Sequence, residues 1–77
     1  MFITKQKDRT WNPMMGDDTL FCGLRINEME GGAALIRINK GARFPTHRHN
    51  SYEETLILSG TVTIGGQRLE EGDYLYT

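Results

Sequence analysis

The chain has 77 residues, with nine Lys and Arg against ten Asp and Glu and a formal net charge of −1. A chain this short makes one domain at most and buries only about 60% of its unfolded surface. We therefore expect it to need added stabilisation, such as a bound metal ion or association with other chains. Without a cluster of Lys and Arg, we expect no nucleic-acid partner. No apolar run approaches the roughly 20 residues that cross a bilayer, so we expect no contact with a membrane.

The chain contains a single cysteine, Cys22, which therefore cannot form a disulfide within the chain. The first ten residues, MFITKQKDRT, lack the apolar core of a secretory signal peptide. Both features predict a cytoplasmic location. We interpret Cys22 as a small buried hydrophobe, with metal ligation as the less favoured reading.

Residues 1–19 are polar and irregular, with Asn12-Pro13 and residues 16–18 as breakers after Trp11. We expect this segment to be an N-terminal arm that lies over another part of the molecule, with Trp11 as its anchor. Residues 20–77 are expected to form one β domain.

Short segments of alternating polarity follow the arm. From Leu20 the pattern has a period of two, which is typical of half-buried strands. Turn signals separate the expected strands, which cover residues 20–26, 33–38, 53–58, 61–64 and 74–77, with an extended segment at 43–49. Turns at this spacing predict an all-β sandwich or barrel.

The strand at 53–58 is apolar on both faces. If Glu53 points inward then Ile57 does too, and Leu56 and Leu58 face the other side. Both faces should then be covered, one by the protein's own barrel and the other by the arm or by a partner chain.

The segment 41–60, GARFPTHRHNSYEETLILSG, contains the chain's two histidines. His47 and His49 are two residues apart, so on a strand both imidazoles project from one face, and Glu53 returns a carboxylate nearby. Two histidines and one carboxylate with open positions suit non-haem iron, and the same ligand types with one water make a catalytic zinc site. The alternative is that the histidines are polar surface residues and that Glu53 and Glu54 are a solvated charge pair.

The residues around this set have simpler interpretations. Glu54 points away from Glu53 on a strand, so we expect it to face solvent or an interface. The three tyrosines, Tyr52, Tyr74 and Tyr76, are core or rim aromatics, or one phenol orients a substrate near the metal.

The same residues resemble the first motif of the cupins, G-x5-H-x-H-x3or4-E-x6-G, which is matched at Gly41, His47, His49, Glu53 and Gly60. Residues 33–77 look most like the cupin domains of ChrR-type anti-sigma factors and of dihydroxyacetophenone dioxygenases. The resemblance implies a cupin-like antiparallel β-barrel, the double-stranded β-helix or jelly roll, shortened at its C-terminus. It also implies one divalent metal ion per chain (zinc, iron or manganese) on His47, His49 and Glu53.

The second cupin motif, G-x5-P-x-G-x2-H-x3-N, is matched only in its first six positions, by residues 72–77. Its histidine, the fourth ligand of the family, is absent, so water, a substrate, a tyrosine or Cys22 would take the remaining positions. The missing last strands leave open sheet edges, which are templates for association. We therefore expect a homo-oligomer, in the first place a dimer.

The resemblance implies a small metal-binding cupin domain with a small organic molecule as ligand or substrate, and with dioxygenase-like chemistry. The alternative is a non-catalytic sensory or structural module of the ChrR type. Because a fold hosts many activities, fold analogy does not decide whether the chain is an enzyme.

Overall fold

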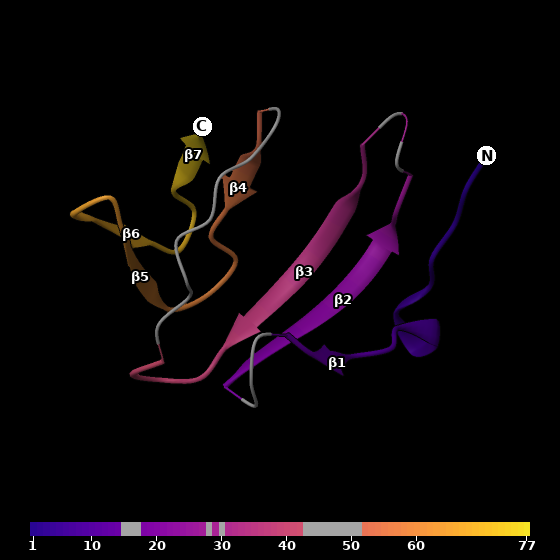
Figure 1. Cartoon of the computed structure of the whole chain (residues 1–77), viewed down its shortest axis with the longest axis horizontal. Coiled ribbons are helices and arrows are strands. Elements are labelled where there is room, and N and C mark those ends of the chain that lie inside the picture. The colour runs from indigo at the N-terminus through magenta and orange to yellow at the C-terminus, as the bar shows by residue number, and fades with distance from the viewer. Residues whose placement is uncertain (15–17, 28, 30, 43–51) are drawn as a thin grey trace. The chain divides into compact units, whose positions relative to one another are not determined.

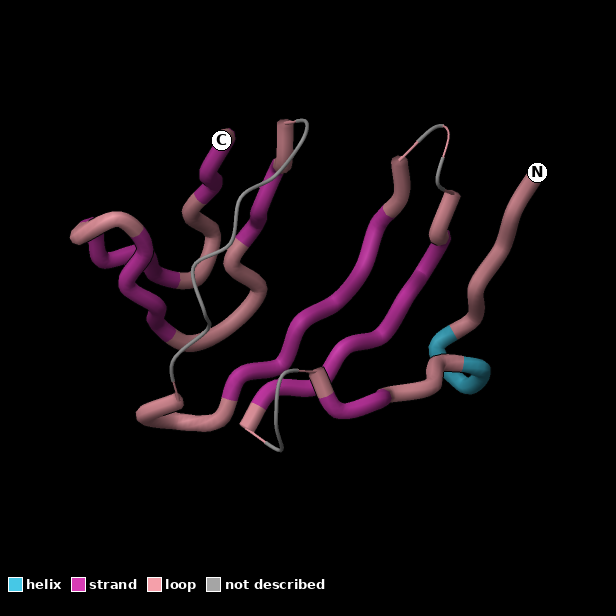
Figure 2. The backbone as a smooth tube through the Cα atoms, in the orientation of Figure 1, coloured by secondary structure: helices cyan, strands magenta, loops and turns pink. Residues whose placement is uncertain are grey.

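The computed structural model describes residues 1–14, 18–27, 29, 31–42 and 52–77. Strands dominate these residues, and one turn of 3-10 helix, η1 (Gln6–Asp8), precedes them (Figure 2). The strands are β1 (Asn12–Pro13), β2 (Thr19–Arg25), β3 (Ala33–Ile38), β4 (Glu54–Leu56), β5 (Thr61–Ile64), β6 (Gln67–Glu70) and β7 (Tyr74–Tyr76). Every strand pair is antiparallel, and the predicted all-β class is confirmed.

The chain divides into two compact units, an N-terminal unit (Met1–Thr46) and a C-terminal unit (His47–Thr77). The N-terminal unit contains one sheet of order β1-β2-β3, and the C-terminal unit contains the two ladders β4-β7 and β5-β6 (Figure 1). Backbone pairing among the described residues does not close these sheets into a barrel. The division into an arm of residues 1–19 and a domain of residues 20–77 stays a prediction.

The central hairpin of the N-terminal unit pairs β2 with β3 from Thr19 opposite Ile38 to Arg25 opposite Ala33, with a shift in register between Gly23 and Arg25. The connection between these strands requires glycine. A Cβ on Gly32 would lie 2.2 Å from the carbonyl oxygen of Arg25, which no side chain can occupy.

The N-terminal arm is bound to this hairpin. β1 pairs with β2 at the sheet edge, a position that tolerates Pro13 although proline has no backbone N–H to donate. The Thr4 hydroxyl donates a 2.7 Å hydrogen bond to the carbonyl of Leu24. The guanidinium of Arg37 lies 4.4 Å from the centre of the Trp11 ring. Trp11 therefore contacts β3 through Arg37. A two-residue strand is too short to show periodicity, and β1 was not predicted.

Few side chains are buried. Among the described residues only Cys22, with no exposed surface, and Thr19, at 3% exposure, are fully enclosed. On the β3 side, Cys22 pairs with Leu35. On the β1 side, Asn12 pairs with Phe21, so that the preceding residue, Trp11, lies next to Cys22. The Cys22 thiol is thus part of a small apolar centre, as predicted from its place in the alternating pattern.

The structure describes the C-terminal unit from Tyr52 onward. β5 and β6 form a hairpin in which Gly65 and Gly66, with φ of 58° and 78°, connect Ile64 directly to its partner Gln67. Two consecutive residues of positive φ in a two-residue loop make a type I′ turn, whose twist matches that of the strands. β6 was not predicted, because its sequence QRLE has one apolar residue and no β-branched one. The described part of the chain contains no helix long and apolar enough to cross a membrane.

Candidate metal site

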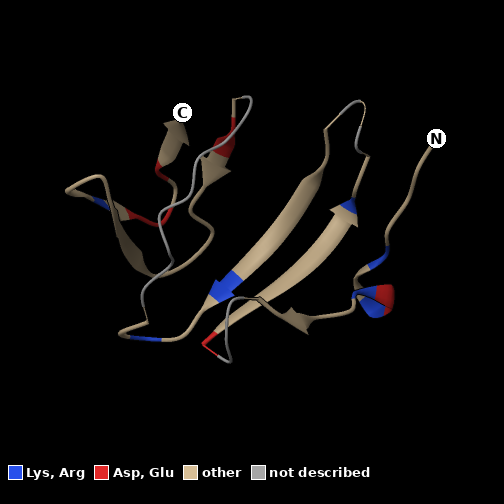
Figure 3. Ribbon diagram, viewed as in Figure 1, with Lys and Arg blue, Asp and Glu red and all other residues tan. Residues whose placement is uncertain are grey.

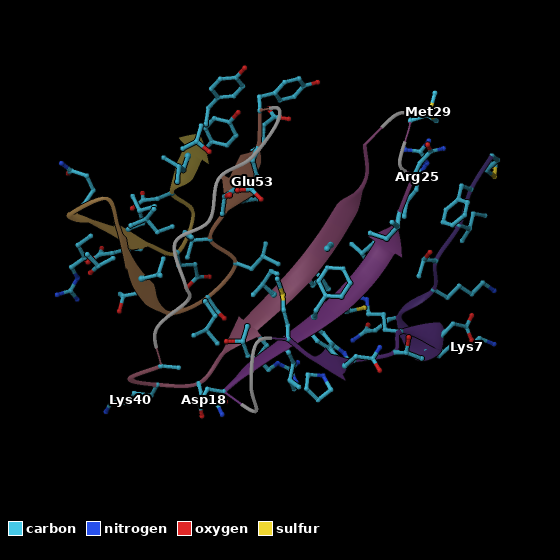
Figure 4. The ribbon with its side chains drawn as sticks, viewed as in Figure 1. Lys7, Asp18, Arg25, Met29, Lys40 and Glu53 are labelled. Atoms are coloured by element: carbon cyan, nitrogen blue, oxygen red, sulfur yellow. The ribbon has the colours of Figure 1, made fainter. Side chains whose placement is uncertain are left out.

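Glu53 lies directly before β4 and is held by two backbone hydrogen bonds to Thr77. The amide of Glu53 donates to the Thr77 carbonyl at 2.7 Å, and the amide of Thr77 donates back to the Glu53 carbonyl at 3.0 Å. These bonds extend the β4-β7 ladder by one residue pair beyond the strand, and Figure 4 shows Glu53 at this end of β4. The Cα of the predicted carboxylate ligand is therefore fixed by both strands.

Alternation along the ladder places Glu53 on the same face as Thr55 and Ile57. The cross-strand partner of Thr55 on this face is Leu75. Thr55, Ile57 and Leu75 are half-buried, whereas Glu53 at the end of the row is exposed. The carboxylate of Glu53 thus lies where this half-buried row meets solvent.

Glu54 lies on the opposite face. Its Oε1 accepts a 2.6 Å hydrogen bond from the hydroxyl of Tyr74 on β7. Tyr52 and Tyr76 stack on this same face, with ring centres 5.8 Å apart and planes 16° from parallel. The hydrogen bond to Glu54, and to a smaller extent burial and the charge of that carboxylate, raise the pKa of the Tyr74 phenol above its ordinary value. The carboxylate of Glu54 therefore contacts Tyr74 on the face opposite Glu53.

The two predicted histidine ligands lie outside the described residues, as does the predicted extended segment at 43–49. Of the predicted set His47, His49 and Glu53, the structure places Glu53 alone. Within the residues that it describes, no three His, Cys, Asp or Glu side chains come together as a metal-binding group. The three-ligand set stays a prediction.

The C-terminal unit is acidic. Figure 3 shows acidic residues at the beginning of β4 and before β7. Residues 52–77 contain one basic residue, Arg68, and five acidic ones, Glu53, Glu54, Glu70, Glu71 and Asp73. A surplus of negative charge raises the local concentration of cations.

The sequence did not predict the bond between Tyr74 and Glu54 or the stacking of Tyr52 on Tyr76. The signal was available, because pairing the alternating segments 53–58 and 74–77 as antiparallel neighbours puts Glu54, Tyr74 and Tyr76 on one face. The register, with Glu54 opposite Tyr76 and Leu56 opposite Tyr74, makes Glu54 and Tyr74 diagonal neighbours. Without the register, the sequence does not say which tyrosine meets the carboxylate.

The antiparallel β fold and the histidine-carboxylate motif of residues 41–60 together define a cupin-like domain. The family model described as ChrR Cupin-like domain matches residues 1–77. The chain therefore belongs to the ChrR cupin-like family, and the match includes the N-terminal arm as well as the segment that carries the resemblance. No curated protein and no solved structure gives a significant match.

Proposed function

We propose that this chain is a metal-binding cupin domain in which His47, His49 and Glu53 hold one divalent ion, and that a small organic molecule binds beside that ion. Family membership, established by the match over residues 1–77, supports this proposal. The donor set is chemically suitable, because neutral imidazoles bind zinc and iron, and a carboxylate adds a charged oxygen that extends the range to manganese.

The observation that carries the proposal is the separation of two adjacent carboxylates. Glu53 lies on the face that continues into Thr55 and Leu75, whereas Glu54 is bound by Tyr74 on the other face. Both Glu53 and Glu54 fit the step of three or four residues after His49, but only Glu53 is followed by six residues and a glycine, Gly60, as the motif requires. Glu53, the carboxylate that the motif selects, therefore lies on the opposite face of the strand from Glu54.

Three protein ligands leave coordination positions for a small molecule. A divalent ion in such a site supplies Lewis-acid chemistry, and iron would supply oxygen chemistry of the dioxygenase type. The backbone pair of Glu53 and Thr77 would hold the Cα from which the carboxylate reaches the ion. The half-buried Ile57 and Leu75 on the same face would exclude water from an apolar ligand.

Native mass spectrometry of the protein, prepared separately with zinc, iron and manganese, tests metal binding. We expect about one ion per chain, and we expect the variant His47→Ala/His49→Ala to retain none. A wild-type protein that retains no ion under any of the three conditions would contradict the proposal.

Oxygen uptake by the iron-loaded protein with small aromatic compounds then tests catalysis. Uptake that depends on both the aromatic compound and Glu53 supports the dioxygenase-like activity. A retained ion without uptake would assign the chain to the non-catalytic class of metal-binding or ligand-binding modules.

A further inference from the structure

Two of the chain's three tyrosines form a stacked pair at one end of the β4-β7 ladder. The ring centres of Tyr52 and Tyr76 lie 5.8 Å apart, with planes 16° from parallel. The register explains this contact, because Tyr76 pairs with Glu54, and Tyr52, two residues earlier, is its diagonal neighbour on the same face. Both tyrosines belong to the C-terminal unit, so the contact is internal to that unit.

The two rings are offset rather than directly face to face. Carbon atoms in contact lie about 3.5–4.0 Å apart, so nearly parallel rings with centres 5.8 Å apart overlap at their edges. The ring carbons next to the phenol oxygen lie on the edge, and in a tyrosyl radical these carbons carry much of the unpaired electron. Both side chains are exposed, Tyr52 at 69% and Tyr76 at 61%, so a small rotation of either ring brings two such carbons together.

The other oxidisable groups are held differently. Tyr74 lies on the same face at 55% exposure, but its hydroxyl donates a hydrogen bond to Glu54. The thiol of Cys22, which would reduce a tyrosyl radical on contact, has no exposed surface. Exposed methionines react with peroxide by taking up an oxygen atom, which is a different reaction from loss of one electron. The stacked pair is therefore the place where two phenol radicals would meet.

We propose that Tyr52 and Tyr76 are a site of oxidative cross-linking, at which a peroxidase-type one-electron oxidant supplied with hydrogen peroxide joins the two rings as dityrosine. Each phenol loses one electron and one proton. The two radicals then form a carbon–carbon bond between ring positions next to the oxygens, and the hydrogens on those carbons move to the oxygens, which restores both phenols. One hydrogen peroxide accepts the two electrons and two protons and becomes two waters.

The cross-link would fasten the end of the ladder that holds Glu53. Tyr52 precedes Glu53 and Tyr76 precedes Thr77, and the backbones of Glu53 and Thr77 are already paired by two hydrogen bonds. A covalent bond beside this pair lowers the entropy of the unfolded chain, as a disulfide does. A short chain with few buried side chains gains stability from such a bond.

Treatment of the dilute full chain with a peroxidase and hydrogen peroxide tests the proposal. Dityrosine fluorescence measures the yield, and mass spectrometry after proteolysis identifies the linked peptides. We expect a product with the mass of one chain less two hydrogens, joined between Tyr52 and Tyr76. Tyr52→Phe and Tyr76→Phe keep the ring but remove the phenol, and each should lower the yield within the chain about ten-fold or more. The matched control Tyr74→Phe should stay within about two-fold of the wild type.

Equal yields in the three variants would overturn the proposal, as would a wild-type product that is linked only between chains or no dityrosine at all. The metal ion is not a reactant, so the yield should be the same in the presence of EDTA, which keeps this test separate from that of the metal site.

Thermal unfolding of the purified cross-linked chain, followed by circular dichroism, tests whether the native ladder accommodates the bond. A link that closes a loop of about 25 residues should raise the Tm by on the order of 10 °C. An unchanged or lower Tm would contradict the proposed stabilisation of the ladder.

Discussion

The hydroxyl of Tyr74 on β7 donates a 2.6 Å hydrogen bond to Oε1 of Glu54 on β4. The two residues are diagonal neighbours on one face of the ladder, because Glu54 pairs with Tyr76 and Leu56 pairs with Tyr74, and a long aromatic side chain can span this diagonal. A hydrogen bond from a phenol to a carboxylate is charge-assisted and short. It fixes Glu54 on the face opposite Glu53.

Glu54→Gln should lower the pKa of Tyr74 towards the ordinary value of about 10. In the wild type the carboxylate stabilises the protonated phenol and repels the phenolate, which raises the pKa. Because the folded-state pKa lies above the unfolded one, the bond contributes its full stability below about pH 10 and loses it as the pH rises through the folded-state pKa. An NMR titration of the Tyr74 ring carbon measures the shift, with Tyr74→Phe as the assignment control. An identical pKa in Glu54→Gln and wild type would contradict the assigned cause.

Cys22→Ser should destabilise the protein by about 1–3 kcal/mol, because it places a hydroxyl in a site from which water is excluded. Cys22→Ala, which removes only the sulfur, should cost about 1 kcal/mol. Urea unfolding followed by circular dichroism measures both.

The thiol of Cys22 should react with Ellman's reagent only after unfolding, because it has no exposed surface. Stoichiometric reaction of the native protein within the dead time would show that the apolar centre of the N-terminal unit is open.

Gly32→Ala should destabilise the protein more than Gly31→Ala does. A Cβ at Gly32 would lie 2.2 Å from the Arg25 carbonyl oxygen, so the β2-β3 connection must move to admit it. At Gly31 the φ of 85° penalises a side chain, but no heavy atom lies within 4 Å, and the cost should be about 1–2 kcal/mol. Equal midpoints in urea unfolding for the two variants would contradict this account of the connection.

The strands with clean alternation were predicted well from the sequence, and the short polar ones were not. The segments 33–38 and 61–64 match β3 and β5 to the residue. The segment 53–58 was predicted too long, because the regular ladder ends at Leu56 although Ile57 still donates a hydrogen bond to Asp73. β6 was not predicted, because its own polar sequence does not indicate a strand. The turn at Gly65-Gly66 is what pairs it with β5.

The candidate site shows a similar limit. Spacing selected Glu53 over Glu54, and period-two alternation correctly put the two carboxylates on opposite faces. The sequence could not supply the strand register, so the bond between Tyr74 and Glu54 and the stacking of Tyr52 on Tyr76 were not predicted. Register depends on which residues pair across strands far apart in the chain, and local periodicity does not contain that information.

Metal affinity of the matched variants Glu53→Gln and Glu54→Gln, measured by isothermal titration with zinc and with manganese, tests the central claim most directly. The two substitutions remove the same charge from adjacent residues on opposite faces of one strand. We predict that Glu53→Gln lowers the affinity at least about 100-fold, as expected for the loss of a charged ligand, and that Glu54→Gln leaves it within about three-fold of the wild type. Equal losses in the two variants, or a greater loss in Glu54→Gln, would contradict the assignment of Glu53 as the ligand.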